Sequence, residues 1–179
     1  MINIKPYQET LGQGVCGPAV LKMLLMYFDL EAGNKSDMEL AKACGTNNLG
    51  TTTTQLTKAI RSFGLKCDEK FNSEFEDIEM ALKRGNPVIV DWFTPGRKDE
   101  SDSEMPDGHY SIVVDLDENN IYLQDPGIGK MRTIPRDSFY RVWFDFDEPN
   151  SDYIKDTKNV FLRYMAEVSK ENLKVQASY

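Results

Sequence analysis

The chain contains the residue types that acyl transfer through a cysteine requires, at Cys16, His109 and Asp125. A cysteine nucleophile needs a base within reach and a third group that orients this base. Cys16 lies in the segment GVCGPA, residues 14–19, directly before an apolar helical pattern. The free N–H groups and the dipole at a helix start favour the thiolate. His109 is the single histidine of the chain, so it is the leading candidate for a base near neutral pH.

A predicted β-hairpin connects His109 with Asp125. The segments 110–116 and 121–124 have strand-like patterns, and the acidic and amide residues of 117–120 suit the turn between them. Paired residues of an antiparallel ladder have a nearly constant index sum, so positions 109 and 125 are expected side by side. Pro126 ends the second strand. The sequence therefore predicts a carboxylate that orients the histidine.

Two glutamines precede the cysteine and are candidates for an oxyanion hole. A side-chain amide donor, together with the backbone N–H of Cys16, would stabilise a tetrahedral intermediate. Gln8 lies eight residues before Cys16 and Gln13 three residues before it. The short gap leaves little chain for Gln13 to fold back over the sulfur, so Gln8 is the stronger candidate.

Helical patterns occupy mainly the first half of the chain and strand patterns the second. Amphipathic spacing predicts helices over residues 18–28, 37–43, 53–63 and 75–84. Ser36 and Glu39 fit a capping box before the second of them. The run 87–93 predicts a buried strand. Alternation over 159–168 favours a strand, although a helical pattern also fits there. These elements predict an α+β fold, with a helical N-terminal half against an antiparallel sheet that carries His109 and Asp125.

Composition indicates one soluble domain. The chain has 179 residues, 40% of them hydrophobic, and a net charge of -8, so residues 1–179 are expected to form a single domain. The acidic charge argues against nucleic acids and anionic membranes as partners. There is no signal-peptide pattern, and the three cysteines do not make a disulfide framework, so we expect a cytoplasmic protein.

No metal or cofactor is expected. Asp115, Asp117 and Asn119 have the spacing of calcium ligands, but the glycine and the glutamate that such a loop also needs are missing. One histidine without paired cysteines does not suit zinc. Cys44 and Cys67 have no base near them in the sequence and are expected to be inert. The polar segment 94–108 leads directly to His109, and we expect it to be a long loop at the rim of a cleft.

The ordered set of motifs resembles a known family. A glutamine, CGPA at the start of an apolar helix, GHY at the start of a strand and then DP are similar to the papain-like bacteriocin-processing peptidases that cleave double-glycine leaders, and to their stand-alone relatives. GTTT at 50–53, GNPVIV at 85–90, and Phe139 followed by Trp143 extend the resemblance. It implies a papain-like fold and thiol peptidase activity, although the gap from Gln8 to Cys16 is longer than the family's usual spacing.

Three functions are compatible with these residues. In the first, Cys16, His109 and Asp125 hydrolyse a peptide or protein substrate, and Gln8 stabilises the oxyanion. In the second, the same acyl-enzyme passes its acyl group to an amine, as a transglutaminase or ligase does. In the third, the chain is an inactive peptide-binding module, against which the complete Cys-His-Asp set argues.

Overall fold

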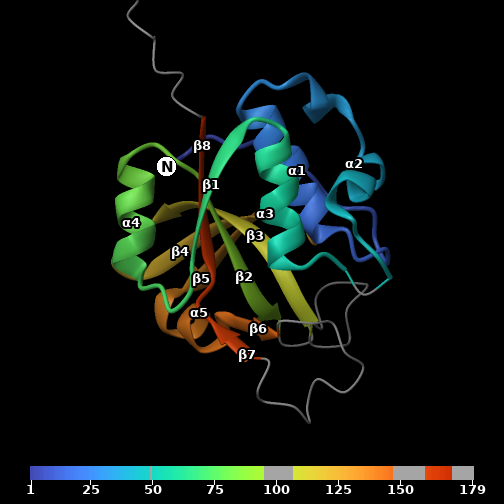
Figure 1. Ribbon diagram of the computed structural model, residues 1–179. Helices are drawn as coiled ribbons and strands as arrows, with labels where there is room; N and C mark the ends of the chain where they lie inside the picture. The colour runs from blue at the N-terminus through green and yellow to red at the C-terminus, as the bar shows by residue number, and fades with distance from the viewer. Residues whose placement is uncertain (49, 95–106, 147–159, 171–179) are drawn as a thin grey trace, which may run out of the picture.

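A six-stranded antiparallel sheet forms the centre of the fold (Figure 1). The computed structural model describes residues 1–48, 50–94, 107–146 and 160–170. The order of strands in the sheet is β1-β8-β2-β3-β4-β5. Their bounds are β1 Leu65–Lys70, β2 Val88–Thr94, β3 Asp107–Leu116, β4 Asn120–Asp125, β5 Lys130–Pro135 and β8 Met165–Lys170. A separate pair of strands consists of β6, Phe144–Phe146, and β7, Val160–Leu162.

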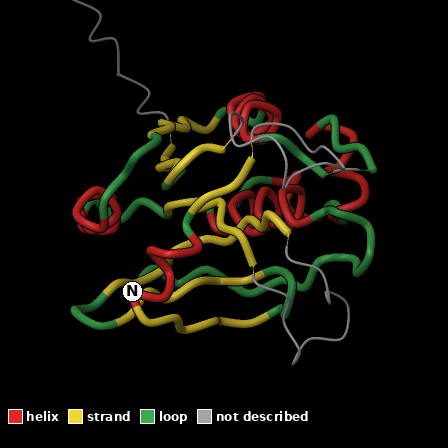
Figure 2. The backbone as a smooth tube through the Cα atoms, turned by 90° about the horizontal axis from the view of Figure 1, so that it is seen from below, coloured by secondary structure: helices red, strands yellow, loops and turns green. Residues whose placement is uncertain are grey.

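Helices cover both faces of this sheet, as Figure 2 shows from below. They are α1 Cys16–Tyr27, α2 Asp37–Cys44, α3 Thr53–Ser62, α4 Phe75–Lys83 and α5 Arg136–Val142, with a short 3-10 helix, η1, over Glu31–Asn34. In Figure 1, α4 lies on one side of the strands and α1, α2 and α3 lie on the other. The structure is thus the α+β fold that the sequence predicts, with one helix of the N-terminal half on the opposite face.

Alternation along β2 explains why the sheet has two cores. Successive side chains of a strand point to opposite faces. Ile89 packs in the core beneath α1 and α3, whereas Val88, Val90 and Trp92 pack in the second core with α4 and α5. A strand with both faces covered needs a nearly continuous apolar run, which is the pattern observed over 87–93. Asp91 interrupts this run on the face of Ile89.

The helices begin at or near the residues where the sequence predicts their starts. Ser36 caps α2, where its hydroxyl accepts from the Glu39 N–H (3.2 Å) and the Glu39 carboxylate accepts from the Ser36 N–H (2.8 Å). The predicted start of the first helix at Pro18 is wrong by two residues, because α1 begins at Cys16. Pro18 is tolerated in this first turn, where backbone N–H groups have no partner within the helix.

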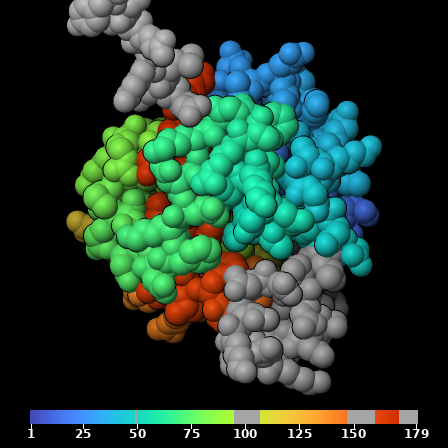
Figure 3. All heavy atoms as spheres, viewed as in Figure 1, coloured from blue at the N-terminus to red at the C-terminus, as the bar shows by residue number. Residues whose placement is uncertain are grey.

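The segment 159–168 is extended rather than helical, but it contains two strands instead of one. Arg163 adopts a positive φ of 48° and separates β7 from β8, while residue 159 lies outside the described residues. Strand β8 lies inside the main sheet, paired with both β1 and β2. Side chains of α3 and β1 fill the middle of the face drawn in Figure 3, beside those of α4. Within the described ranges, no helix has both the length and the apolar character needed to cross a membrane.

Candidate active site

Cys16 is the first residue of α1 and is partly exposed. The turn before it contains Gly14 at φ +62°, and Gly17 packs so closely on Thr51 that a Cβ there would lie 3.0 Å from the Thr51 Cβ. The Thr51 carbonyl in turn accepts a hydrogen bond from the Tyr110 hydroxyl of β3 (3.0 Å). The nucleophile candidate is therefore fixed between the start of α1, the 50–53 loop and the sheet.

His109 and Asp125 meet across β3 and β4. The ladder runs from Leu116↔Ile121 to Ile112↔Gln124, with a β-bulge between Val113 and Asp115. Beyond it, His109 Nε2 lies 2.6 Å from Asp125 Oδ1, and both side chains are buried. The hairpin thus brings together the two residues that the sequence analysis paired, with a bulge that it did not anticipate.

At least three groups hold the Asp125 carboxylate. Its Oδ1 also accepts from the Gly127 N–H (2.9 Å), and its Oδ2 accepts from the Arg132 Nε–H (2.6 Å). Burial by itself raises the pKa of Asp125, but the charges and hydrogen bonds of His109 and Arg132 outweigh it and hold this pKa well below its ordinary value. Asp125 is therefore an ionised acceptor with fixed orientation.

The Cys16 thiol interacts with the His109 imidazole. Burial alone would lower the pKa of His109, but the charge and hydrogen bond of Asp125, together with those of Cys16, raise it to about 10. Because Nε2 is engaged by Asp125, Nδ1 is the nitrogen available to the sulfur. Trp92 lies edge-on to the ring at 5.8 Å between centroids and restricts its rotation. The arrangement suits a thiolate–imidazolium pair.

The other two cysteines have the opposite environment. Cys44 and Cys67 are buried, and burial raises the pKa of Cys44 to about 12 and that of Cys67 to about 11. A thiol with so high a pKa is almost entirely protonated at neutral pH and is a poor nucleophile. Their environment agrees with the expectation that both are inert.

Gln8 packs against the turn that follows Asp125, and no contact between Gln8 and Cys16 is described. A Cβ on Gly129 would lie 2.6 Å from the Gln8 Cβ, and the neighbouring Glu9 N–H donates to the Pro126 carbonyl (2.9 Å). Gln13 is exposed. Neither glutamine is placed as an oxyanion donor by these contacts, so that role stays a prediction for Gln8.

Cys16 opens into a cavity of about 80 Å³. Its walls come from the start of α1, the 50–53 loop and strands β2, β3 and β6. Among its lining residues are two carboxylates that the sequence analysis missed, Asp91 and Asp145. Of the predicted rim loop, residues 95–106 lie outside the described residues, and Asp107 and Gly108 line the cavity. No group of three or more side chains suited to a metal ion occurs in the described part of the chain.

Comparison with known proteins identifies the family. The model of the Peptidase C39-like family matches residues 1–149. The chain belongs to this family. An uncharacterised protein of Methanothermobacter thermautotrophicus is 30% identical to this chain over 128 residues, which cover 72% of this chain and 75% of the relative.

Two solved peptidase domains share the fold of this C39-like chain. The peptidase domain of Streptococcus ComA, a bifunctional ABC transporter of a quorum-sensing pathway, has a TM-score of 0.63 at 17% identity, covering 94% of this chain and all of that domain. A double-glycine motif protease from an AMS/PCAT transporter, solved with its leader peptide, has a TM-score of 0.62 at 19% identity, covering 95% and 94%. The papain-like fold expected from the motif resemblance is confirmed.

Proposed function

We propose that this C39-like protein hydrolyses peptide bonds through a Cys16 thiolate, with His109 as the acid and base and Asp125 as the group that orients His109. The observation that supports this most strongly is the bond between His109 Nε2 and Asp125 Oδ1. It fixes the ring and leaves Nδ1 for the thiol. Membership of a peptidase family supports the same reaction class.

The reaction proceeds through an acyl-enzyme. The Cys16 sulfur attacks the carbonyl carbon of the scissile bond, and a C–S bond forms while negative charge moves to the oxygen. The C–N bond then breaks, and the His109 imidazolium gives its proton to the leaving nitrogen. A water molecule next attacks the thioester and gives its proton to His109. Cleavage of the C–S bond returns the thiolate and the imidazolium.

The oxyanion needs donors on the side of the α1 start. The backbone N–H of Cys16 belongs to the first turn of α1, where such groups have no partner within the helix, and it is the first proposed donor. Gln8 is the proposed second donor, because it packs against the turn that directly follows Asp125.

Cleavage of a peptide library, read by mass spectrometry, tests this function. We expect products with new carboxyl termini in the wild type, none with Cys16→Ala, and unchanged rates in EDTA. Products joined to an added amine would indicate acyl transfer instead. Binding of peptides without any product, in a protein whose Cys16 does not react with electrophiles, would contradict the proposal and favour a binding module.

A further inference from the structure

The cavity beside Cys16 is acidic. Asp91, Asp107 and Asp145 all line it, and no lysine, arginine or histidine is among its described lining residues. They range from buried to exposed: Asp91 is 1% exposed, Asp145 is partly buried and Asp107 is exposed. These carboxyl groups therefore extend from the inner end of the cavity to the surface, and Cys16 lines the same cavity.

Strand geometry places the two inner carboxylates. Asp91 pairs with Tyr110 across β2 and β3, and it shares the face of Ile89 that packs toward α1. Asp145 comes from β6 and lies directly on the backbone of Gly108, where any side chain would overlap its carboxylate. Gly108 therefore leaves the space that Asp145 occupies.

The two inner carboxylates hydrogen-bond to each other, which compensates them only in part. Asp91 Oδ1 is buried without a hydrogen-bond partner. Burial, together with the charge of Asp145, raises the pKa of Asp91 well above its ordinary value, and burial raises the pKa of Asp145 to about 6. A buried polar atom without a partner is unfavourable, and more so when it is charged. A positively charged group in the cavity would remove this cost.

We propose that this cavity is the specificity pocket of the enzyme and takes a positively charged side chain, lysine or arginine, next to the scissile bond of the substrate. This rests on the proposed function, since the pocket lies beside the proposed nucleophile. A volume of about 80 Å³ exceeds the roughly 10–15 Å³ that one water needs and leaves room for a cationic head group. Because its pKa is raised well above the ordinary value, Asp91 holds the proton of the hydrogen-bonded pair, and the pair meets the cation with the negative charge of Asp145. Asp107 adds a second carboxylate nearer the opening.

Charged thiol reagents test the pocket without requiring any peptidase activity. The probes are 2-aminoethyl methanethiosulfonate, a cation, and 2-sulfonatoethyl methanethiosulfonate, an anion, and the measured quantity is the ratio of their rates at Cys16. We expect the cation to react faster, and Asp145→Asn to lower the ratio by roughly tenfold, as the loss of one nearby charge implies. Asp107→Asn, which removes the outer carboxylate of the cavity, should lower it as well, so the test does not depend on one variant folding.

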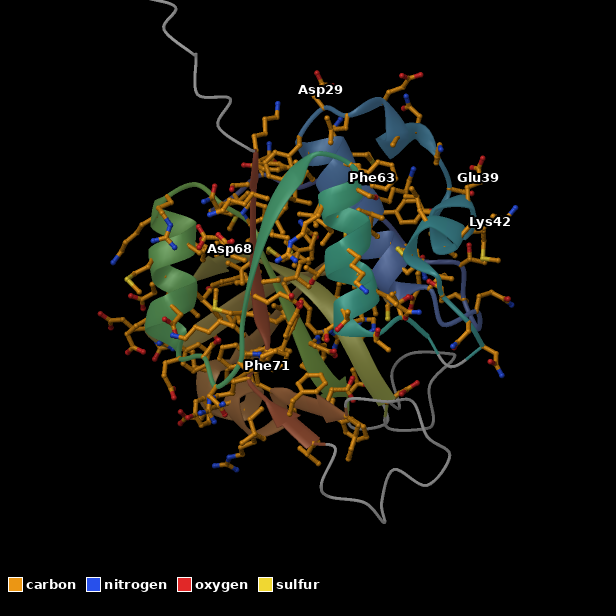
Figure 4. All side chains as sticks on the ribbon, in the orientation of Figure 1. Asp29, Glu39, Lys42, Phe63, Asp68 and Phe71 are labelled. Carbon is orange, nitrogen blue, oxygen red and sulfur yellow. The ribbon has the colours of Figure 1, made fainter. Side chains whose placement is uncertain are left out.

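Asp29→Asn is the matched control. It removes the same charge from an exposed residue beyond the C-terminal end of α1, about 18 Å along the helix from Cys16 (Figure 4). Asp29 has a positive φ of 57°, which asparagine also tolerates. This variant should leave the reagent ratio at the wild-type value.

Matched peptides complete the test. Substrates that differ only in lysine, norleucine or glutamate at each position flanking the scissile bond should show a preference for lysine of about tenfold or more in kcat/KM at one position. That preference should fall with Asp145→Asn and persist with Asp29→Asn. If peptides are cleaved without a cation preference and the reagent ratio is unchanged in both pocket variants, the pocket proposal is wrong while the peptidase stands. If nothing is cleaved but the ratio falls as expected, the proposed function fails instead.

Discussion

At the scale of single residues, Asp125 has two separate tasks. One oxygen accepts from His109 and the other from Arg132, at 2.6 Å each, and the carboxylate is buried. Removing the whole side chain would leave two cationic groups without their partner, which in buried pairs costs about 3–5 kcal/mol. Asp125→Ala therefore mixes catalysis with stability, and asparagine is the more informative substitution.

We expect Asp125→Asn to lower turnover strongly while the protein still folds. The amide oxygen can accept from His109, but the negative charge that holds the imidazolium is lost. The equivalent change in a serine triad costs about 10⁴ in turnover, and a cysteine nucleophile should lose less, because a thiol is intrinsically more acidic than a hydroxyl. Turnover and melting temperature are measured on the same preparation.

Arg132→Gln is the control for this substitution, because it breaks the other half of the Asp125 network without touching His109. It should lower the melting temperature and leave most of the turnover. Near-normal turnover in folded Asp125→Asn would remove Asp125 from the proposed machinery.

The sequence predicts the site residues that have a distinctive type or context. A unique histidine, a cysteine before a helix and an aspartate at the facing end of a hairpin can each be recognised locally. No local motif distinguishes Asp91 or Asp145. Their side chains come together only because β6 packs against β2 and β3 in the folded chain. A charged residue within the apolar run 87–93 was the one available signal, and it concerned Asp91 alone.

At the scale of elements, the contact between β3 and β6 shapes the cavity. Gly108 precedes His109 on β3, and the Asp145 carboxylate occupies the space beside its Cα. The need for glycine here is steric, because no positive φ occurs at this position. Packing between these two strands therefore links the proposed base to the proposed pocket.

Gly108→Ala should destabilise the fold by roughly 1–3 kcal/mol, as overpacking usually does. Chemical denaturation measures the loss in the free energy of unfolding. A double-mutant cycle isolates its cause: Asp145→Ala in the same chain removes the overlapping carboxylate and should recover most of the loss. Additive losses in the double variant would contradict the steric account.

Elements with a strong apolar pattern could be predicted, and exposed ones could not. The helices near 18–28, 37–43, 53–63 and 75–84 all occur, as do the strands of the hairpin. Strands β1 and β5 were missed because each forms an edge of the sheet and is rich in charged, exposed residues. Edge strands commonly carry charged residues, and these obscure the alternation of apolar and polar residues that identifies a strand. Helix α5 has seven residues, too few for a clear helical period.

At the scale of the whole molecule, the site depends on the complete fold. Helix α1 supplies Cys16, β3 supplies His109 and β4 supplies Asp125, while β2 and β6 supply the carboxylates of the cavity. Cys44 and Cys67 are buried within the core beneath α1 and α3. The folded protein therefore offers three thiols in two very different environments, and this difference permits a direct test of the central claim.

The central claim is that Cys16 and His109 act as a thiolate–imidazolium pair. The most direct test is alkylation by iodoacetamide, measured at each cysteine by mass spectrometry from pH 6 to 8. With a pKa of about 10, His109 stays protonated throughout this range and loses its proton only at higher pH, so the pair should persist. We predict that Cys16 reacts much faster than Cys44 and Cys67, at a nearly constant rate, and that His109→Asn slows it about tenfold or more at pH 6. An ordinary thiol, with a pKa near 8.5, would instead gain about tenfold in rate per pH unit. A Cys16 rate that rises in this way, or that is indifferent to His109→Asn, would contradict the account.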